Sequence, residues 1–135
     1  MINYAECHDN NTIWDKLLLS YTDATKTDLE KMQQLALTIV LTSQGIPFLH
    51  AGTEFMRTKK GVENSYNSGD SINAIDWSLK SKNIDLTRYI EQLIRMRKAH
   101  PSFRMTTAAQ ISQYIHFDEK APAGNMVYTI NGAAL

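Results

Sequence analysis

The chain has 135 residues, of which 43% are hydrophobic and 21% are charged, an ordinary composition for a globular protein. Its 14 Lys and Arg residues balance 14 Asp and Glu residues, so the formal net charge is zero, which argues against binding to nucleic acid or to an anionic membrane surface. No apolar run reaches the roughly 18 residues of a membrane-spanning helix, and the single cysteine, Cys7, excludes an internal disulfide bond.

A run of four polar side chains, residues 8–11, follows a short stretch at the start of the chain that can form a strand. An α/β protein presents a site in this way, at the carboxyl end of a strand. Asp9 could then be a catalytic carboxylate, and its polar neighbours, including His8, could bind hydroxyl groups. The alternative is that these side chains cap the helix that apolar spacing predicts for residues 12–21.

A long second helix is predicted for residues 27–44. Thr27 and Glu30 have the spacing of a capping box, and Gly45 can end the helix. Its part between residues 35 and 41 is apolar almost all round. We therefore expect other elements to cover this helix on more than one side.

Residues 46–50 are predicted to form a second short strand, and residues 55–83 then lack any long periodic segment. Structureless segments of this length are usually functional loops or disorder. The part between residues 64 and 73 is rich in Asn, Asp and Gly. These residue types also favour turns, so a loop without any binding role is the alternative.

The clearest helix is predicted for residues 85–99, where five apolar residues form one stripe: Leu86, Tyr89, Ile90, Leu93 and Ile94. We expect the Arg and Lys residues of this helix to form a solvated face. The last segment, residues 108–135, alternates between apolar and polar residues and predicts two strands joined by a turn at residues 122–124. Helices that alternate with strands predict the α/β class.

Four stretches resemble, in the same order, the type I pullulanases of glycoside hydrolase family 13, the α-amylase superfamily. Residues 3–17, NYAECHDNNTIWDKL, resemble the catalytic motif that closes the seventh barrel strand of that family. Residues 45–54, GIPFLHAGTE, are similar to its eighth strand, and residues 89–104, ending in RMRKAHPSFR, to its eighth helix. Residues 64–77, beginning NSYNSGDSIN, resemble a loop that lines sugar subsites.

The resemblance implies the last two strand–helix units of a (β/α)8 TIM barrel over residues 1–105. Residues 106–135 would then be the first strands of an incomplete all-β domain. A complete barrel needs about 200 residues or more. We therefore expect the chain to be the C-terminal part of a larger catalytic domain.

The reaction implied by the resemblance is retaining hydrolysis of α-1,6-glucosidic linkages in pullulan, starch or glycogen-type polysaccharides. The Asp of the family motif, here Asp9, stabilises the transition state, and the preceding His, here His8, hydrogen-bonds the sugar. Further substrate-binding residues are expected in this motif and in the loop: Asn10, Tyr66, Asp70 and Asn73. An aromatic ring can stack on a sugar, and amides and carboxylates can bind its hydroxyl groups.

Retaining hydrolysis needs two carboxyl groups about 5 Å apart. In this family they come from strands that would precede Met1, so we expect no hydrolysis by this chain alone. No organic cofactor is implied, and although some relatives bind calcium, nothing in the sequence identifies metal ligands. The implied partner is an α-glucan, with no nucleic acid or membrane, and unpaired strand edges predict a homo-oligomer. The sequence indicates no compartment.

Other functions compete with this interpretation. One is an isoamylase or α-amylase-like relative, which the continuation of the first motif disfavours, and another is a non-catalytic carbohydrate-binding or assembly module. His50 and Glu54 have the four-residue spacing of zinc ligands on a helix, but Gly52 between them disfavours a helix there. A thiol nucleophile formed by Cys7 and His8 is disfavoured, because neighbours on a strand point to opposite faces.

Overall fold

The computed structural model of the protein describes residues 1–131, which form a mixed fold of helices and a few short strands. The α-helices are α1 (Ile13–Ser20), α2 (Lys26–Thr42), α3 (Asp70–Asn73), α4 (Ser78–Lys82), α5 (Ile84–Ala99) and α6 (Ala108–Tyr114). Two 3-10 helices, η1 (Thr53–Phe55) and η2 (Pro101–Arg104), precede α3 and follow α5. The strands are β1 (Ile2–Asn3), β2 (Ile46–Pro47), β3 (Ile115–Phe117) and β4 (Tyr128–Ile130).

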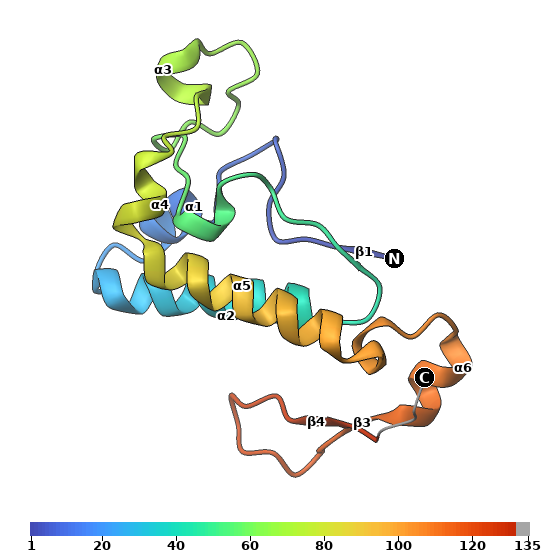
Figure 1. The fold of residues 1–135 in the computed structure, drawn as a ribbon. Helices are drawn as coiled ribbons and strands as arrows, with labels where there is room; N and C mark the ends of the chain where they lie inside the picture. Colours follow the sequence, from blue (N-terminus) through green and yellow to red (C-terminus); the bar gives the residue numbers. More distant parts are fainter. Residues whose placement is uncertain (132–135) are drawn as a thin grey trace.

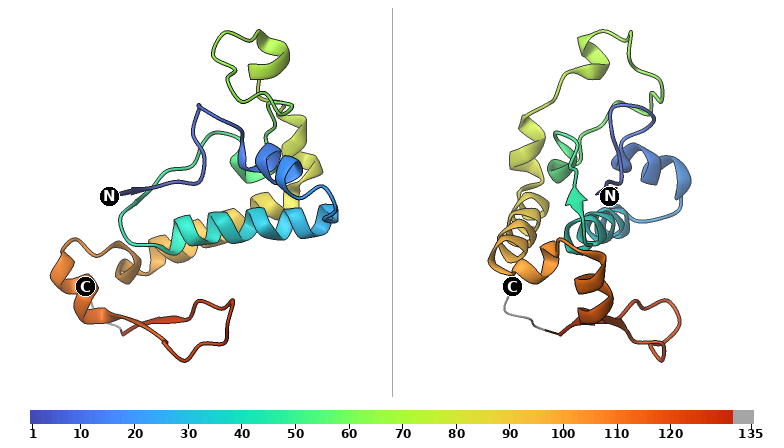
Figure 2. Two further views of the ribbon diagram at one scale, coloured as in Figure 1. Left: turned by 180° about the vertical axis from the view of Figure 1, so that it is seen from behind. Right: turned by 90° about the vertical axis from the view of Figure 1, so that its right-hand side faces the viewer.

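Helices α2 and α5, the two longest helices of the described residues, run side by side (Figure 1). Helix α1 packs on α2, and the loop that carries α3 projects away from the helices at one end (Figures 1 and 2). The unit formed by α6, β3 and β4 follows the other end of α5. None of the helices in the described part of the chain is long and apolar enough to cross a membrane.

Strands β1 and β2 pair in parallel, with Ile2 opposite Ile46 and Asn3 opposite Pro47. The connection between them runs through α1 and α2, as a parallel pair requires. Both strands are shorter than predicted, because each has only one neighbour within the described residues and the ladder ends after two residue pairs. A Cβ at Gly45 would lie 2.8 Å from the Met1 carbonyl oxygen, so this close approach of the two strands requires glycine.

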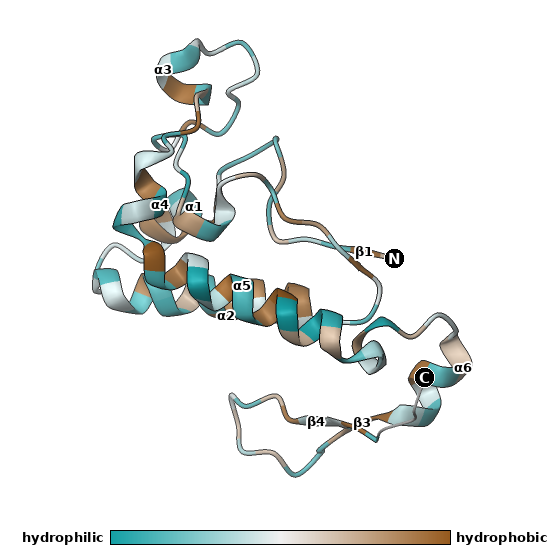
Figure 3. Cartoon of the chain, in the orientation of Figure 1, coloured by the Kyte–Doolittle hydropathy of each residue, from teal (hydrophilic) through white to brown (hydrophobic). Residues whose placement is uncertain are grey.

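The core joins the helices through six buried residues: Ile13, Leu37, Leu41, Met56, Leu86 and Ile90. The apolar stripe predicted for residues 85–99 is therefore confirmed, since α5 spans Ile84–Ala99 and directs this stripe to the core. Figure 3 shows hydrophobic and hydrophilic residues alternating along this helix. A hydrogen bond of 2.7 Å between the Thr38 and Tyr89 hydroxyl groups also ties α2 to α5.

Helix α2 differs from its prediction at its start. The N-cap is Thr25, whose hydroxyl accepts the N–H of Asp28 at 3.2 Å, so the predicted cap at Thr27 was wrong by two residues. The expected cover on more than one side is confirmed, since both α1 and α5 pack on α2. Leu35 and Ile39 on its remaining face are 61% and 48% exposed.

Arg97 contradicts the prediction that the basic residues of α5 form a solvated face. Its side chain is buried, and its guanidinium donates hydrogen bonds to the carbonyl oxygens of Leu41, Ser43 and Gly45 at 2.6–2.9 Å. The carbonyls of Leu41 and Ser43 lie at the C-terminal end of α2, where helix geometry leaves carbonyl oxygens without partners, and Gly45 directly precedes β2. Arg97 of α5 therefore supplies hydrogen-bond donors to carbonyl oxygens at the C-terminal end of α2.

The C-terminal unit contains only part of the predicted strand pair. Residues 108–114 form α6, because Thr107 and Gln110 make a reciprocal capping box. The two strands are confined to β3 and β4, which pair antiparallel, and the turn near Gly124 is confirmed by its left-handed φ of 82°. The barrel origin of the fold and the division at residue 105 stay predictions, and residues 132–135 of the second predicted domain lie outside the described residues.

Candidate functional site

A hollow of about 220 Å³ brings three separate segments of the chain together. It is lined by His8, Asp9, His50, Arg57, Lys59, Ser65, Tyr66 and Asn73. Four of the six predicted site residues are among them: His8, Asp9, Tyr66 and Asn73. Asn10 and Asp70 are exposed and lie outside this lining.

His8 and Asp9 form the exposed rim of the hollow. Their side chains are 84% and 70% exposed, and His8 Nε2 lies 3.5 Å from Asp9 Oδ1. The predicted strand does not reach them, since β1 ends at Asn3. Asn10 adopts a left-handed φ of 61°, which turns the chain sharply away from Asp9 toward α1.

Two buried charged residues, Lys59 and Asp15, stabilise this rim through hydrogen bonds. Neither residue was predicted from the sequence. Lys59 is 1% exposed, and its Nζ donates to the carbonyl oxygens of His8 and Glu63, both at 3.2 Å. The buried Asp15 carboxylate in turn accepts the Lys59 N–H at 2.6 Å and the Thr58 hydroxyl proton. In the sequence both residues look like any other charged residue. That they are buried is known only once the fold is known.

The loop of residues 65–73, which we call the 65–73 loop, closes the other side of the hollow. The Asn73 amide donates to the carbonyl oxygens of Ser65 and Ser68 at 2.7 and 2.5 Å, so its donors organise the loop. Tyr66 is 82% exposed beside it and presents its ring to solvent. Arg57 joins the loop to the segment after β2, because its guanidinium donates to the Asn73 carbonyl oxygen at 3.0 Å.

Glu6 and His50 form a buried pair behind the hollow. Glu6 Oε1 lies 3.8 Å from His50 Nδ1, and the side chains are 4% and 14% exposed. The other carboxylate oxygen of Glu6 accepts the N–H of Ile13 at the start of α1. Burial raises the pKa of the Glu6 carboxyl above 4.5, against the opposing effects of Thr53, Ile13 and Arg57. Burial, followed by the charges of Arg57 and Lys59, lowers the pKa of His50 below 6.5.

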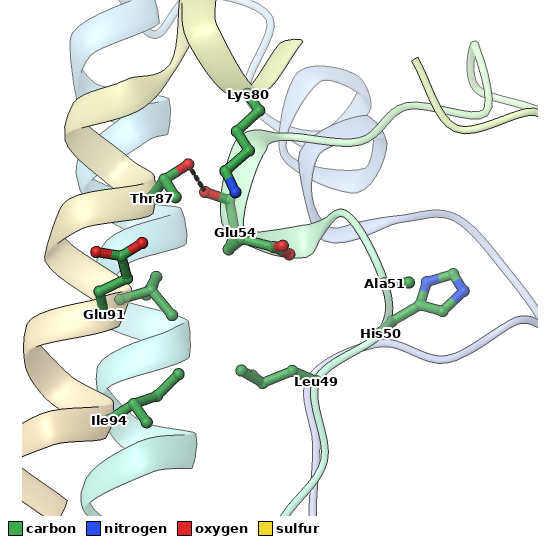
Figure 4. A pocket seen from close by; sticks show the side chains of 9 residues that line it. Leu49, His50, Ala51, Glu54, Lys80, Thr87, Glu91 and Ile94 are labelled. Carbon is green, nitrogen blue, oxygen red and sulfur yellow. Dashed lines mark hydrogen bonds between the residues drawn. The ribbon is translucent and has the colours of Figure 1, made fainter. Parts of the chain in front are cut away.

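A second hollow of about 280 Å³ lies on the opposite side of residues 49–54, against α5 (Figure 4). There the Thr87 hydroxyl donates to the Glu54 carbonyl oxygen at 3.2 Å, while the His50 ring points away from α5 (Figure 4). The Glu54 carboxylate accepts the Gly52 N–H at 3.1 Å. These contacts place His50 and Glu54 in different networks and give no support to a zinc pair.

The side chains that line the first hollow suit a binding site with a single carboxylate. Of its eight lining residues only Asp9 carries a carboxylate, accompanied by the Tyr66 ring, by amide and hydroxyl groups, and by Arg57 and Lys59. Such a set can hydrogen-bond hydroxyl groups and stabilise a positive charge beside Asp9. Within residues 1–131 no group of three or more His, Cys, Asp or Glu side chains could hold a metal ion, so we derive no step through calcium.

No family model matches the chain. It is 47% identical over 114 residues to the pullulanase of Bacillus subtilis (strain 168), an alignment that covers 84% of this chain and 16% of that protein. The structure of the pullulanase from Bacillus acidopullulyticus superposes with a TM-score of 0.91 at 48% identity over 94% of this chain. The chain is related to the type I pullulanases.

The similarity to solved pullulanases includes a complex with an oligosaccharide. The D470A mutant of the Paenibacillus barengoltzii pullulanase, complexed with maltotetraose, superposes with a TM-score of 0.92 at 50% identity. That match covers 96% of this chain and 20% of the pullulanase, and the Bacillus acidopullulyticus match covers 16% of its pullulanase. The chain thus spans between a sixth and a fifth of these pullulanases.

Proposed function

We propose that the chain contributes the last two strand–helix units of a (β/α)8 barrel to a pullulanase-type glycoside hydrolase. In this proposal β1 with α1 and α2 is the seventh unit, and β2 with α5 is the eighth. The parallel pairing of β1 and β2 supports the assignment, because parallel strands joined by helices are the repeating unit of such a barrel. Residues 1–105 would belong to the barrel, and residues 106–135 would begin the β-domain that follows.

The activity we propose for the complete enzyme is retaining hydrolysis of α-1,6-glucosidic linkages in pullulan, starch or glycogen-type polymers. The observation that carries this proposal is the hollow that joins Asp9 and His8 to Tyr66 and Asn73. These residues come from two segments far apart in the sequence, and both segments resemble pullulanase motifs. The maltotetraose held by the related Paenibacillus barengoltzii enzyme supports an α-glucan as the ligand.

In the proposed reaction the Asp9 carboxylate stabilises the transition state. A glycosidase passes through a species resembling an oxocarbenium ion, and a carboxylate beside the sugar ring lowers its energy. His8, 3.5 Å from Asp9, would hydrogen-bond the same sugar. Asn10, Tyr66, Asp70 and Asn73 would bind neighbouring sugar units through hydrogen bonds and stacking. No cofactor is needed for these steps.

A chimeric enzyme tests the proposal directly. Residues 1–131 of this chain would replace the matching segment of the Bacillus subtilis pullulanase, with which the chain shares 47% identity. We expect the chimera to release reducing sugar from pullulan, and an Asp9→Asn chimera to lose that activity. A folded chimera that binds pullulan without cleaving it would instead support a carbohydrate-binding module.

The exposed edges of β1 and β2 support a further part of the proposal, the association of two copies of the isolated chain. Each strand has a single partner within residues 1–131, and Ile2 and Ile46 are 61% and 64% exposed. Parallel strands normally lie inside a sheet that is covered on both faces. Pairing with a second copy would cover this edge and the apolar residues beside it.

A further inference from the structure

A line of polar contacts runs from the interior of the molecule to the 65–73 loop. It begins at Glu6, whose carboxylate caps the start of α1 through the Ile13 N–H and lies 3.8 Å from His50 Nδ1. On the other side of the imidazole ring, His50 Nε2 lies 3.2 Å from Arg57 Nη1. Arg57 then donates through Nη2 to the Asn73 carbonyl oxygen at 3.0 Å.

Several polar atoms along this line lack a hydrogen-bond partner although they are buried. Among the described residues these are Glu6 Oε1, His50 Nδ1 and Arg57 Nε. A buried polar group without a partner costs free energy, and such groups often mark a site with a role beyond packing. Here Glu6 Oε1 and His50 Nδ1 face each other, 3.8 Å apart, so a small rotation of either side chain would join them.

The contact with Arg57 decides where His50 carries its proton. A guanidinium is always protonated and has donors only, so His50 Nε2 must accept the Arg57 hydrogen bond. Nε2 then carries no proton, and neutral His50 carries its proton on Nδ1. That N–H points to the Glu6 carboxylate. The whole line therefore depends on a neutral His50 in one tautomer.

We propose that Glu6, His50 and Arg57 form a proton-sensitive positioning relay, which holds the 65–73 loop beside Asp9 only while His50 is neutral. Arg57 reaches the loop at Asn73, whose amide in turn holds the Ser65 and Ser68 carbonyl oxygens. Glu6 anchors the other end, three residues before Asp9 in the same segment. The three residues act through the loop and are positioning residues. The inference does not require that the ligand is a glucan or that the chain takes part in hydrolysis.

Protonation of His50 would break the relay at a single contact. Cationic His50 has N–H donors on both ring nitrogens, so Nε2 could no longer accept from Arg57, and two positive charges would lie 3.2 Å apart. The other charged groups that face His50 are Lys59 and His8, while Arg57 and Asp15 face Glu6. Lys59 and His8 add to the repulsion, and only Glu6 on the Nδ1 side opposes it. Acid should therefore release the loop.

The first test is the tautomer of His50 in the intact chain. Long-range proton–nitrogen NMR spectra of the 15N-histidine-labelled chain distinguish the two neutral tautomers and the cation, and the His50→Gln variant identifies the His50 signals by their loss. We expect the Nδ1–H tautomer at neutral pH. A neutral His50 protonated at Nε2, or a cationic His50 at neutral pH, would overturn the proposal.

The second test measures the loop itself by amide hydrogen exchange as the pH is lowered, corrected for the intrinsic pH dependence of exchange. The reporting amides are Ser68, Ile72 and Asn73, which form hydrogen bonds of 2.9–3.2 Å within the loop. We expect them to lose protection by about fivefold or more as His50 titrates, the change that one lost hydrogen bond gives in an opening equilibrium. The amides of α5 should keep their protection over the same pH range.

Two variants make the exchange measurement specific. His50→Gln can still accept from Arg57 through its amide oxygen but cannot gain a charge, so it should keep the loop protected in acid. His100→Gln alters an exposed histidine at the end of α5 and should behave as the unaltered chain does. The relay would be contradicted if the loop amides of His50→Gln lost as much protection in acid as those of the unaltered chain. It would also be contradicted if the amides of the unaltered chain lost none. Failure of the chimeric enzyme on pullulan would change neither expectation.

Discussion

Lys59 holds His8 by its main chain: the buried ammonium donates to the His8 carbonyl oxygen at 3.2 Å. The same nitrogen donates to the Glu63 carbonyl oxygen, also at 3.2 Å, so a single side chain joins the segment of Asp9 to the loop that leads to Tyr66. The position of the Asp9 carboxylate thus depends on Lys59, which lies 50 positions further along the chain.

Replacing Lys59 with methionine should destabilise the chain. Methionine keeps the apolar length of the side chain but leaves the His8 and Glu63 carbonyl oxygens without this donor. We expect a loss of about 1–3 kcal/mol in the free energy of unfolding, measured by urea denaturation. Lys60→Met is the matched control, because Lys60 is the exposed neighbour. Equal stability of the two variants would show that the Lys59 contacts contribute nothing.

The helical core was predictable from local patterns, because the stripe of α5 repeats at the helical period and ends at a proline. The start of α2 was not, since Thr25 and Thr27 are both followed by an acidic residue three positions later. Only packing selects Thr25. Residues 108–114 show the same conflict: alternation of Ile111, Gln113 and Ile115 suggested a strand, but the Thr107 capping box prevailed.

The residues of the candidate site could likewise be predicted only in part from the sequence. The resemblance identified His8 and Asp9 and the loop with Tyr66 and Asn73, because those stretches have distinctive sequences. The residues that hold them in place had no such signal. Lys59 and Asp15 look like ordinary surface charges in the sequence, and their burial follows from contacts with segments more than 40 residues away. Such long-range burial is a property of the fold and not of any local pattern.

Asp9→Asn in the chimeric enzyme should leave pullulan binding largely intact and reduce turnover by about a hundredfold or more, the loss expected when one electrostatic stabiliser is removed. Asparagine keeps the shape of the side chain and removes its charge. The control is Asp23→Asn, an exposed aspartate in the turn between α1 and α2. Turnover of the Asp9→Asn chimera close to that of the control would remove Asp9 from the reaction.

The stability of the chain should fall as the pH drops just below 6.5, because the folded state lowers the pKa of His50. In that window the unfolded chain binds more protons than the folded chain, so acid favours unfolding. Glu6 has the opposite effect: burial raises its pKa above 4.5, so the stability that its protonated carboxyl contributes to the folded state is lost as the pH rises above 4.5. Urea denaturation at a series of pH values should therefore show a weaker loss below pH 6.5 in His50→Gln, and identical pH profiles would contradict this origin.

The isolated chain should form dimers or larger assemblies at micromolar concentration. The outer edges of β1 and β2 have no partner within residues 1–131, and the outer face of α2 exposes Leu35 and Ile39. Ile46→Lys places a charge on the exposed strand and should shift the population toward the monomer. Light scattering measures both effects. A compact monomer of the unaltered chain under these conditions would refute the association.

The chain alone should hydrolyse no glycosidic bond. Retaining cleavage needs two carboxyl groups about 5 Å apart on either side of the scissile bond. The one carboxylate among the eight residues that line the hollow is Asp9, whose proposed role is a different one, the stabilisation of the transition state. Glu6 cannot supply either of these two groups, because it is 7% exposed and its carboxylate accepts the Ile13 N–H. The Glu54 carboxylate is bound to the Gly52 N–H and does not line the hollow.

A reducing-sugar assay of the purified chain on pullulan and on branched maltodextrin measures this directly, with buffer and the Asp9→Asn variant as controls. We expect the chain, its variant and buffer to give the same signal. The chimeric enzyme, assayed beside them, supplies the two missing carboxyl groups and shows that the assay detects cleavage. Turnover by the chain alone that Asp9→Asn abolishes would contradict this expectation, and would mean that rearranged Glu6 and Glu54, or carboxylates of a second copy of the chain, supply both missing carboxyl groups.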